Sequence, residues 1–199
     1  MPPSFRLKGL HVLEDSVSGA VAAAALSGSL ALRVLKLVLE IAGRKHDSAR
    51  LRELIDAAAR GAEHLIALAA EDGAAYAAYM KARKEGSPDV QAALRRAIES
   101  PLAAARAAAG GIDLCAEAAG HTRGAIAADV GGAAALLAGA VRAILCSLDA
   151  NLGLLDDEVF AREMAAERRR LEMHAIRQAD RVLTTVKTAS NSDLIVPPA

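Results

Sequence analysis

The chain has 199 residues, of which 53% are hydrophobic and only 2% aromatic, and its 24 basic and 24 acidic residues give a formal net charge of zero. This length is sufficient for one domain with a substantial core. Balanced charge and few aromatic side chains argue against nucleic-acid binding, which depends on a basic surface and often on stacking rings. The core must be built from Ala, Leu, Val and Ile, a composition that favours closely packed helices.

Hydrophobic periodicity predicts an all-α chain of one short N-terminal helix and five long helices. Glycines, prolines and capping residues mark the helix ends, which gives helices over residues 4–14, 19–43, 47–84, 88–119, 124–150 and 157–188. We expect a kink or break near Ser100-Pro101, because proline lacks the N–H of a helix interior. Short connections favour a mostly antiparallel bundle, with one domain over residues 1–188 and a flexible tail over 189–199.

The stretches 19–43 and 124–150 are the most apolar parts of the chain, and the second carries only Asp129, Arg142 and Asp149 as charges. Their internal charges and high alanine content favour buried core helices over membrane spans. A helix that is apolar all round is expected to be buried all round. Two such helices are more than one small bundle can cover, so the sequence predicts a homodimer with no membrane or nucleic-acid partner.

The sequence contains no phosphate-binding loop, dinucleotide glycine fingerprint or zinc-ligand spacing. The two cysteines, Cys115 and Cys146, fit neither a metal site nor a disulfide pattern, and the N-terminus lacks the continuous apolar segment of a signal peptide. We therefore expect a cytoplasmic protein with no metal and no tightly bound cofactor.

Two carboxylates are candidates for chemistry. Asp72 falls on the apolar stripe of the 47–84 helix, one turn before Tyr76. Asp129 lies near the start of the 124–150 helix, where a buried ionised carboxylate is costly unless it is paired. Buried carboxylates often mark functional sites. The alternatives are that Asp72 reaches water at a rim, and that Asp129 only benefits from the positive end of its helix.

Five segments, in their order and spacing, resemble the cyclodeaminase domain of formiminotransferase-cyclodeaminase and the related bacterial methenyltetrahydrofolate cyclohydrolases. They are SGAVAAAALSGSLAL, EDGAAYAAYM, ESPLAAA, AADVGGAAALLAGAVRA and NLGLLDDEVF, and the resemblance extends from about residue 5 to 188. It implies an all-helical dimer that acts on one-carbon units carried by tetrahydrofolate. Cyclodeaminases close a formimino group into the methenyl bridge and release ammonia, whereas cyclohydrolases open that bridge with water. Either reaction moves a proton at a carbon held between two nitrogens, which suits a positioned carboxylate.

The resemblance also assigns roles residue by residue. It implies proton transfer by Asp72 and Asp129, and substrate contacts by Ser18, Gly19, Ala20, Tyr76 and Asn151. Where the family has a Pro-Gly-Gly-Gly-type turn, this chain has Ser18-Gly19-Ala20-Val21, whose side chains narrow the approach of a ligand to the backbone.

The functional prediction is therefore an enzyme with a tetrahydrofolate derivative as its substrate. A cyclohydrolase is favoured over a cyclodeaminase, because the chain carries no transferase domain to supply a formimino group. The alternative is a diverged family member that binds a different pterin-like or other ligand, or a non-catalytic helical dimer.

Overall fold

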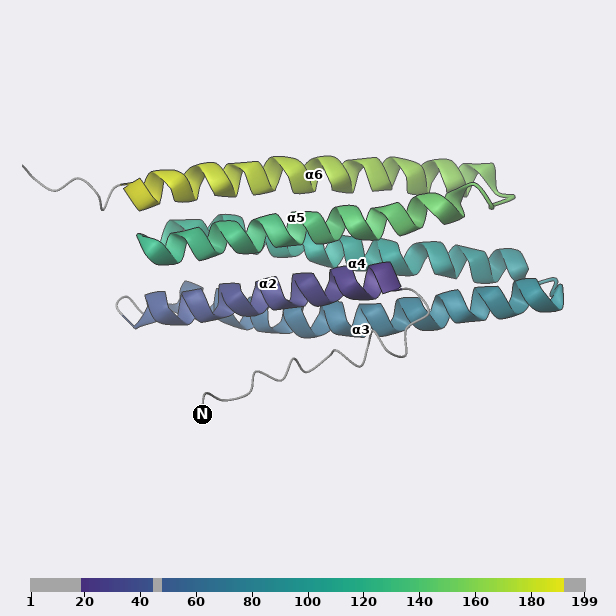
Figure 1. Cartoon of the computed structure of the whole chain (residues 1–199), viewed down its shortest axis with the longest axis horizontal. Helices are drawn as coiled ribbons and strands as arrows, with labels where there is room; N and C mark the ends of the chain where they lie inside the picture. The colour runs from purple at the N-terminus through teal and green to yellow at the C-terminus, as the bar shows by residue number, and fades with distance from the viewer. Residues whose placement is uncertain (1–18, 45–47, 192–199) are drawn as a thin grey trace, which may run out of the picture.

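A computed structural model describes residues 19–44 and 48–191 (Figure 1). Five long helices make up this part of the chain, which confirms the predicted all-α fold. They are α2 (Gly19–Gly43), α3 (Ala49–Glu85), α4 (Val90–Ala118), α5 (Ala125–Leu152) and α6 (Glu158–Asn191), with a single 3₁₀ turn, η1 (Ala119–His121), after α4. The expected helix over residues 4–14 lies outside the described residues. The last helix ends at Asn191 instead of residue 188.

Consecutive helices run antiparallel, as predicted (Figure 1). Helices α2, α3, α4 and α5 form a closed four-helix arrangement, because α5 packs against both α4 and α2. Helix α6 lies outside this bundle and packs against α5 and, less extensively, α4. The fifth helix therefore extends one side of the bundle and leaves the outward side of α2 and α5 uncovered by any described helix (Figure 1).

Short capped turns set the ends of α3. At its start the Ser48 hydroxyl accepts a hydrogen bond of 3.1 Å from the backbone N–H of Leu51, a typical serine N-cap. At its end Gly86 adopts the left-handed conformation with φ of 62°, where a residue with a Cβ would be strained. These two turns keep α3 antiparallel to both of its neighbours in sequence.

The core depends on close approach between helices at small residues. A Cβ added at Gly111 of α4 would lie 3.0 Å from one methyl of Leu137 on α5 and 3.2 Å from a methyl of Leu32 on α2. A Cβ added at Gly28 of α2 would lie 3.5 Å from Leu137 and 3.0 Å from Leu65 on α3. The leucine side chains therefore occupy the space that the glycines leave, and the Leu137 side chain, which is fully buried, joins three helices.

The break expected near Ser100-Pro101 is wrong, since α4 runs without interruption from Val90 to Ala118. Pro101 is buried inside this helix. It has no N–H to donate to the carbonyl of Ala97, one turn earlier. Packing of α4 against α3 and α5 on either side keeps the helix continuous despite this lost hydrogen bond.

The expectation that α5 is buried on all sides is also wrong. One side packs against α2, α4 and α6, but the other leaves Leu136 with 47% of its surface exposed. Asp129 lies on this exposed side, so the predicted burial of its carboxylate is not observed. Helices α2 and α5 are long and apolar enough to span a membrane, with 56% and 50% of their most apolar windows buried in the bundle.

Adjacent glycines of α4 test the packing at Leu137. We expect Gly111→Val to lower the free energy of unfolding by about 1–3 kcal/mol, because its side chain must displace Leu137 and Leu32. The matched variant Gly110→Ala adds a methyl group with nothing within 4 Å. It should raise the free energy by about 0.5–1 kcal/mol through helix propensity. Urea unfolding measures both, and equal effects of the two changes would contradict this description of the core.

Candidate functional site

A cavity of about 270 Å³ lies at the end of the bundle where α2 begins. Four helices supply its walls: the first turn of α2, the middle of α3, the first third of α4 and the last turn of α5. The lining residues are Gly19, Ala20, Val21, Asp72, Tyr76, Ala97, Pro101, Ser147, Ala150 and Asn151. Gly19 and Ala20 are exposed and form the rim, so the cavity is open to solvent beside the first turn of α2.

Asp72 is the charged group of this cavity. Its side chain is on the inward face of α3 and only 3% of the residue is exposed. Tyr76 follows one helical turn later on the same face and is half-buried. Its ring packs at 6.4 Å from that of Tyr79, measured between ring centroids, and Tyr79 is itself buried in the core. The sequence prediction that Asp72 falls on the buried stripe is therefore confirmed, and the phenol beside it is held by aromatic packing.

The wall formed by α4 contains a proline inside the helix. Because Pro101 lacks an N–H, the Ala97 carbonyl receives no hydrogen bond from the position four residues later. Both residues line the cavity, and the pyrrolidine ring of Pro101 takes the place of the missing N–H in front of this carbonyl. Within the described chain the buried Ser100 hydroxyl has no hydrogen-bond partner, so it does not donate to this carbonyl.

The wall formed by α5 carries Ser147, Ala150 and Asn151, which share one face of its last turns. The following loop holds this end of α5 in place. The Asn151 carbonyl accepts a hydrogen bond of 3.1 Å from the backbone N–H of Leu154. The Gln91 amide of α4 donates to the Leu154 carbonyl at 3.2 Å. The hydroxyl of Ser147 and the amide of Asn151 thus sit on a turn that is tied to α4.

Charged and aromatic contacts fix the start of α6 against α4 near this loop. The Arg95 guanidinium lies 4.6 Å from the centre of the Phe160 ring and forms an ion pair with Asp157. One oxygen of Asp157 also accepts the backbone N–H of Phe160 at 3.0 Å. That backbone hydrogen bond and the nearby Arg95 charge lower the pKa of the Asp157 carboxyl. Arg95 is not among the residues that line the cavity. Its contacts instead hold the start of α6 against α4 beside the cavity.

The cavity therefore combines one buried carboxylate with a phenol, a hydroxyl and an amide. Such a set can accept N–H hydrogen bonds from a ligand and move a proton at a bound atom. Within residues 19–44 and 48–191, no group of three His, Cys, Asp or Glu side chains is placed to hold a metal ion. The chemistry that these residues support is proton transfer and electrostatic stabilisation of a cation.

The structure brings together five of the residues predicted to form the site, namely Gly19, Ala20, Asp72, Tyr76 and Asn151. Ser18 lies outside the described residues. Asp129 lies 18 positions before Ser147 on the same helix, a separation of roughly 27 Å along its axis, and does not line the cavity of its own chain.

Sequence reasoning did not assign five lining residues to the site, namely Val21, Ala97, Pro101, Ser147 and Ala150. A signal for them exists in helical spacing. Ala97 and Pro101 are four positions apart, as Asp72 and Tyr76 are, and Ser147 and Asn151 repeat that spacing. This spacing does not show which helices face one another across the cavity, because that depends on how the bundle packs.

Larger hollows of about 450 and 510 Å³ lie around the C-terminal half of α6. Thr184 and Thr185 line both of them, and each hydroxyl already donates to a carbonyl of its own helix. Every ionisable residue that lines them is exposed. The smaller cavity at α2 is the better candidate because it encloses a buried carboxylate.

Comparisons with known proteins agree on the type of fold. The sequence model of the formiminotransferase-cyclodeaminase family matches residues 13–170, which include every lining residue of the cavity. The fold is similar to the crystal structure of a formiminotetrahydrofolate cyclodeaminase from Thermotoga maritima. The TM-score is 0.80 and the sequence identity 22%, with 85% of this chain and 88% of that chain covered. No curated protein matches the sequence significantly.

Replacing Pro101 tests how much stability the missing hydrogen bond to the Ala97 carbonyl costs. In Pro101→Ala the new N–H can donate to that carbonyl and complete the helix. We expect the free energy of unfolding to rise by about 1–2 kcal/mol, less than the roughly 3 kcal/mol cost of an interior proline because a buried ring is lost as well. Urea unfolding measures the change. A loss of stability would show that the carbonyl has another donor in the folded protein.

Proposed function

Because the chain belongs to the formiminotransferase-cyclodeaminase family, we propose that it acts on the one-carbon unit of a tetrahydrofolate substrate in the cavity that holds Asp72. The observation that carries this proposal is the carboxylate of Asp72, 3% exposed in a cavity open at the first turn of α2. A carboxylate buried at the wall of an open cavity is a candidate for a role in binding or chemistry.

The charge of the substrate matches that of the cavity. The methenyl group of tetrahydrofolate is an amidinium, in which one carbon shares a positive charge between two nitrogens. A carboxylate in a site of low dielectric stabilises such a cation more strongly than water does. Asp72 is the carboxylate that lines the cavity among the described residues.

The proton balance of the reaction assigns a role to Asp72. In ring closure, a folate N–H nitrogen attacks the formimino carbon and loses its proton, the bond from that carbon to the terminal nitrogen breaks, and the departing ammonia takes up a proton. In ring opening, water adds to the methenyl carbon and loses a proton as the carbon–nitrogen bond breaks. Asp72 gives the proton in the first case and accepts it in the second. Tyr76 and Asn151, on either side of the cavity, orient the reacting group through the phenol and the amide.

The volume of the cavity indicates how much of the substrate it holds. At about 270 Å³ it lies just below the range of roughly 300–1,000 Å³ that encloses whole drug-sized ligands. The cavity therefore takes the reacting ring system. The rest of the substrate extends over the exposed rim at Gly19 and Ala20.

The proposal is tested by comparing the rate at which the Asp72→Asn variant and the wild-type protein convert the one-carbon unit. The substitution keeps the shape and hydrogen bonding of the side chain but removes its charge and basicity. We expect the rate to fall about 100- to 10,000-fold. Absorbance of the methenyl bridge measures its formation from the formimino substrate and its disappearance in water, with spontaneous hydrolysis as the baseline. The direction that the protein accelerates distinguishes a cyclodeaminase from a cyclohydrolase.

Glu71→Gln is the matched control, because it removes the neighbouring carboxylate from an exposed position outside the cavity. It should retain the wild-type rate. Absence of any rate above the baseline, together with no thermal stabilisation by folates, would overturn the proposal. It would favour a family member with a different ligand or a non-catalytic role.

A further inference from the structure

Helix α3 extends beyond the cavity that holds Asp72. The first turn of α2 lines this cavity together with Asp72 and Tyr76, whereas α3 continues to Glu85, nine residues or roughly 13 Å past Tyr76. The ends of α3 and α4 project past the start of α2 (Figure 1). A molecule that leaves the cavity beside the first turn of α2 therefore passes along the projecting end of α3.

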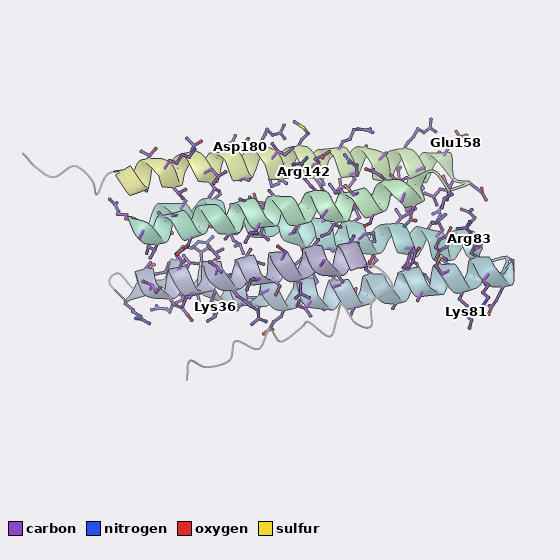
Figure 2. The ribbon with its side chains drawn as sticks, in the orientation of Figure 1. Lys36, Lys81, Arg83, Arg142, Glu158 and Asp180 are labelled. Carbon is purple, nitrogen blue, oxygen red and sulfur yellow. The ribbon has the colours of Figure 1, made fainter. Side chains whose placement is uncertain are left out.

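Arg83 lies on the cavity side of this projecting end. It follows Asp72 by 11 positions, close to three helical turns, and Tyr76 by seven positions, close to two. Residues separated by whole turns share one side of a helix, so Arg83 continues the side that carries the carboxylate and the phenol. Lys81 follows Asp72 by nine positions, or two and a half turns, and lies on the opposite side. Figure 2 shows the two side chains pointing away from each other, with Arg83 toward the other helices.

The guanidinium of Arg83 is accessible to a ligand. The residue is exposed, and within residues 19–44 and 48–191 its side chain forms no hydrogen bond or ion pair. Arginines between neighbouring helices are instead paired with carboxylates, as in Arg106–Glu167 and Arg168–Asp149. An arginine binds a carboxylate through two parallel N–H···O bonds. The ligand group that this side chain matches is therefore a carboxylate that approaches along α3.

The proposed substrate carries such groups at a limited distance from its one-carbon unit. One of the two nitrogens that hold this unit in tetrahydrofolate bears a benzoyl ring, and an amide joins the ring to glutamate. By ordinary bond lengths, the glutamate carboxylates of an extended tail lie roughly 10–13 Å from the one-carbon unit.

The same distance separates the cavity from Arg83. Asp72 and Arg83 are 11 residues apart, so their Cα atoms are separated by roughly 16 Å along α3. Helical side chains lean toward the start of their helix, which brings the guanidinium back to roughly 10–14 Å from the level of Asp72. We propose that Arg83 binds a carboxylate of the substrate tail while the one-carbon unit lies beside Asp72, with the benzoyl ring between them next to Tyr76.

This inference rests on the proposed function and adds a determinant of specificity to it. A pterin without a tail fills the cavity but makes no contact with Arg83, whereas a folate makes both contacts. Arg83 thus selects folates over simpler pterins through binding energy gained away from the reacting carbon. Salt screens an exposed charge pair, so this selection decreases as the ionic strength rises.

Calorimetric titration separates the contribution of the tail from that of the ring system. The two ligands are 5-formyltetrahydrofolate and the corresponding 5-formyltetrahydropterin with a methyl group in place of the tail. We expect Arg83→Gln to weaken folate binding about 5- to 20-fold and to leave the affinity for the tail-less pterin unchanged. Arg83→Lys should fall between wild type and Arg83→Gln, because an ammonium keeps the charge but not the paired hydrogen bonds.

Lys81→Gln is the matched control, since it removes the same charge from the opposite side of the same helix. It should bind both ligands as the wild-type protein does. Three results would overturn the role of Arg83: unchanged folate affinity in Arg83→Gln, an equal loss in Lys81→Gln, or an equal loss for the tail-less pterin. The second would indicate only a long-range effect of charge, and the third a change in the cavity itself.

Kinetics distinguish failure of this inference from failure of the proposed function. If the protein converts the folate substrate, Arg83→Gln should raise KM with little change in kcat, because the tail contact is the same in the ground state and the transition state. Conversion with an unchanged KM in Arg83→Gln would overturn the tail site alone. Folate binding without conversion would contradict the proposed function alone, because the titration still decides the tail site. A wild-type protein that binds neither ligand would overturn both.

Discussion

The contact of Leu137 with two glycines positions the other parts of this bundle. An alanine-rich core with few aromatic rings can be well packed only if the helix backbones approach closely. Gly28 of α2 and Gly111 of α4 provide that approach, and the Leu137 side chain of α5 fills the space. This contact fixes the level at which α2 crosses α5. It therefore sets how far the first turn of α2 stands from the last turn of α5, where the cavity lies.

The cavity itself is formed by helix interiors, whereas sites in many folds lie on loops. Residues one turn apart on α3, α4 and α5 each contribute a pair to its walls. The irregular element is Pro101, which lacks the N–H that would donate to the Ala97 carbonyl and whose ring lines the cavity. The proline reduces the stability of the helix that carries it. Such a local cost is typical of a residue retained for function.

Sequence periodicity correctly predicted the long helices and the burial of Asp72, because a 3.6-residue repeat of apolar residues marks the side of a helix that faces other protein. The apolar sequence around Asp129 led to a wrong prediction that its carboxylate is buried, whereas the residue is exposed. The outward side of α5 consists largely of Ala, Gly and Leu around Asp129, Arg142 and Asp149, and such a composition does not by itself show whether one side of a helix is buried. The continuity of α4 through Pro101 was also missed, because the packing that supports a proline helix is a tertiary property. The pairing of Ala97 with Asn151 across the cavity depends on helix register, which no single segment encodes.

A crystal structure with 5-formyltetrahydrofolate, a stable compound that carries a one-carbon group, tests the central claim most directly. The account predicts that the ring bearing the one-carbon group occupies the cavity, within hydrogen-bond distance of the Asp72 carboxylate, with the remainder of the molecule over Gly19 and Ala20. Folate bound in one of the threonine-lined hollows of α6, or a cavity left empty at saturating folate, would contradict it.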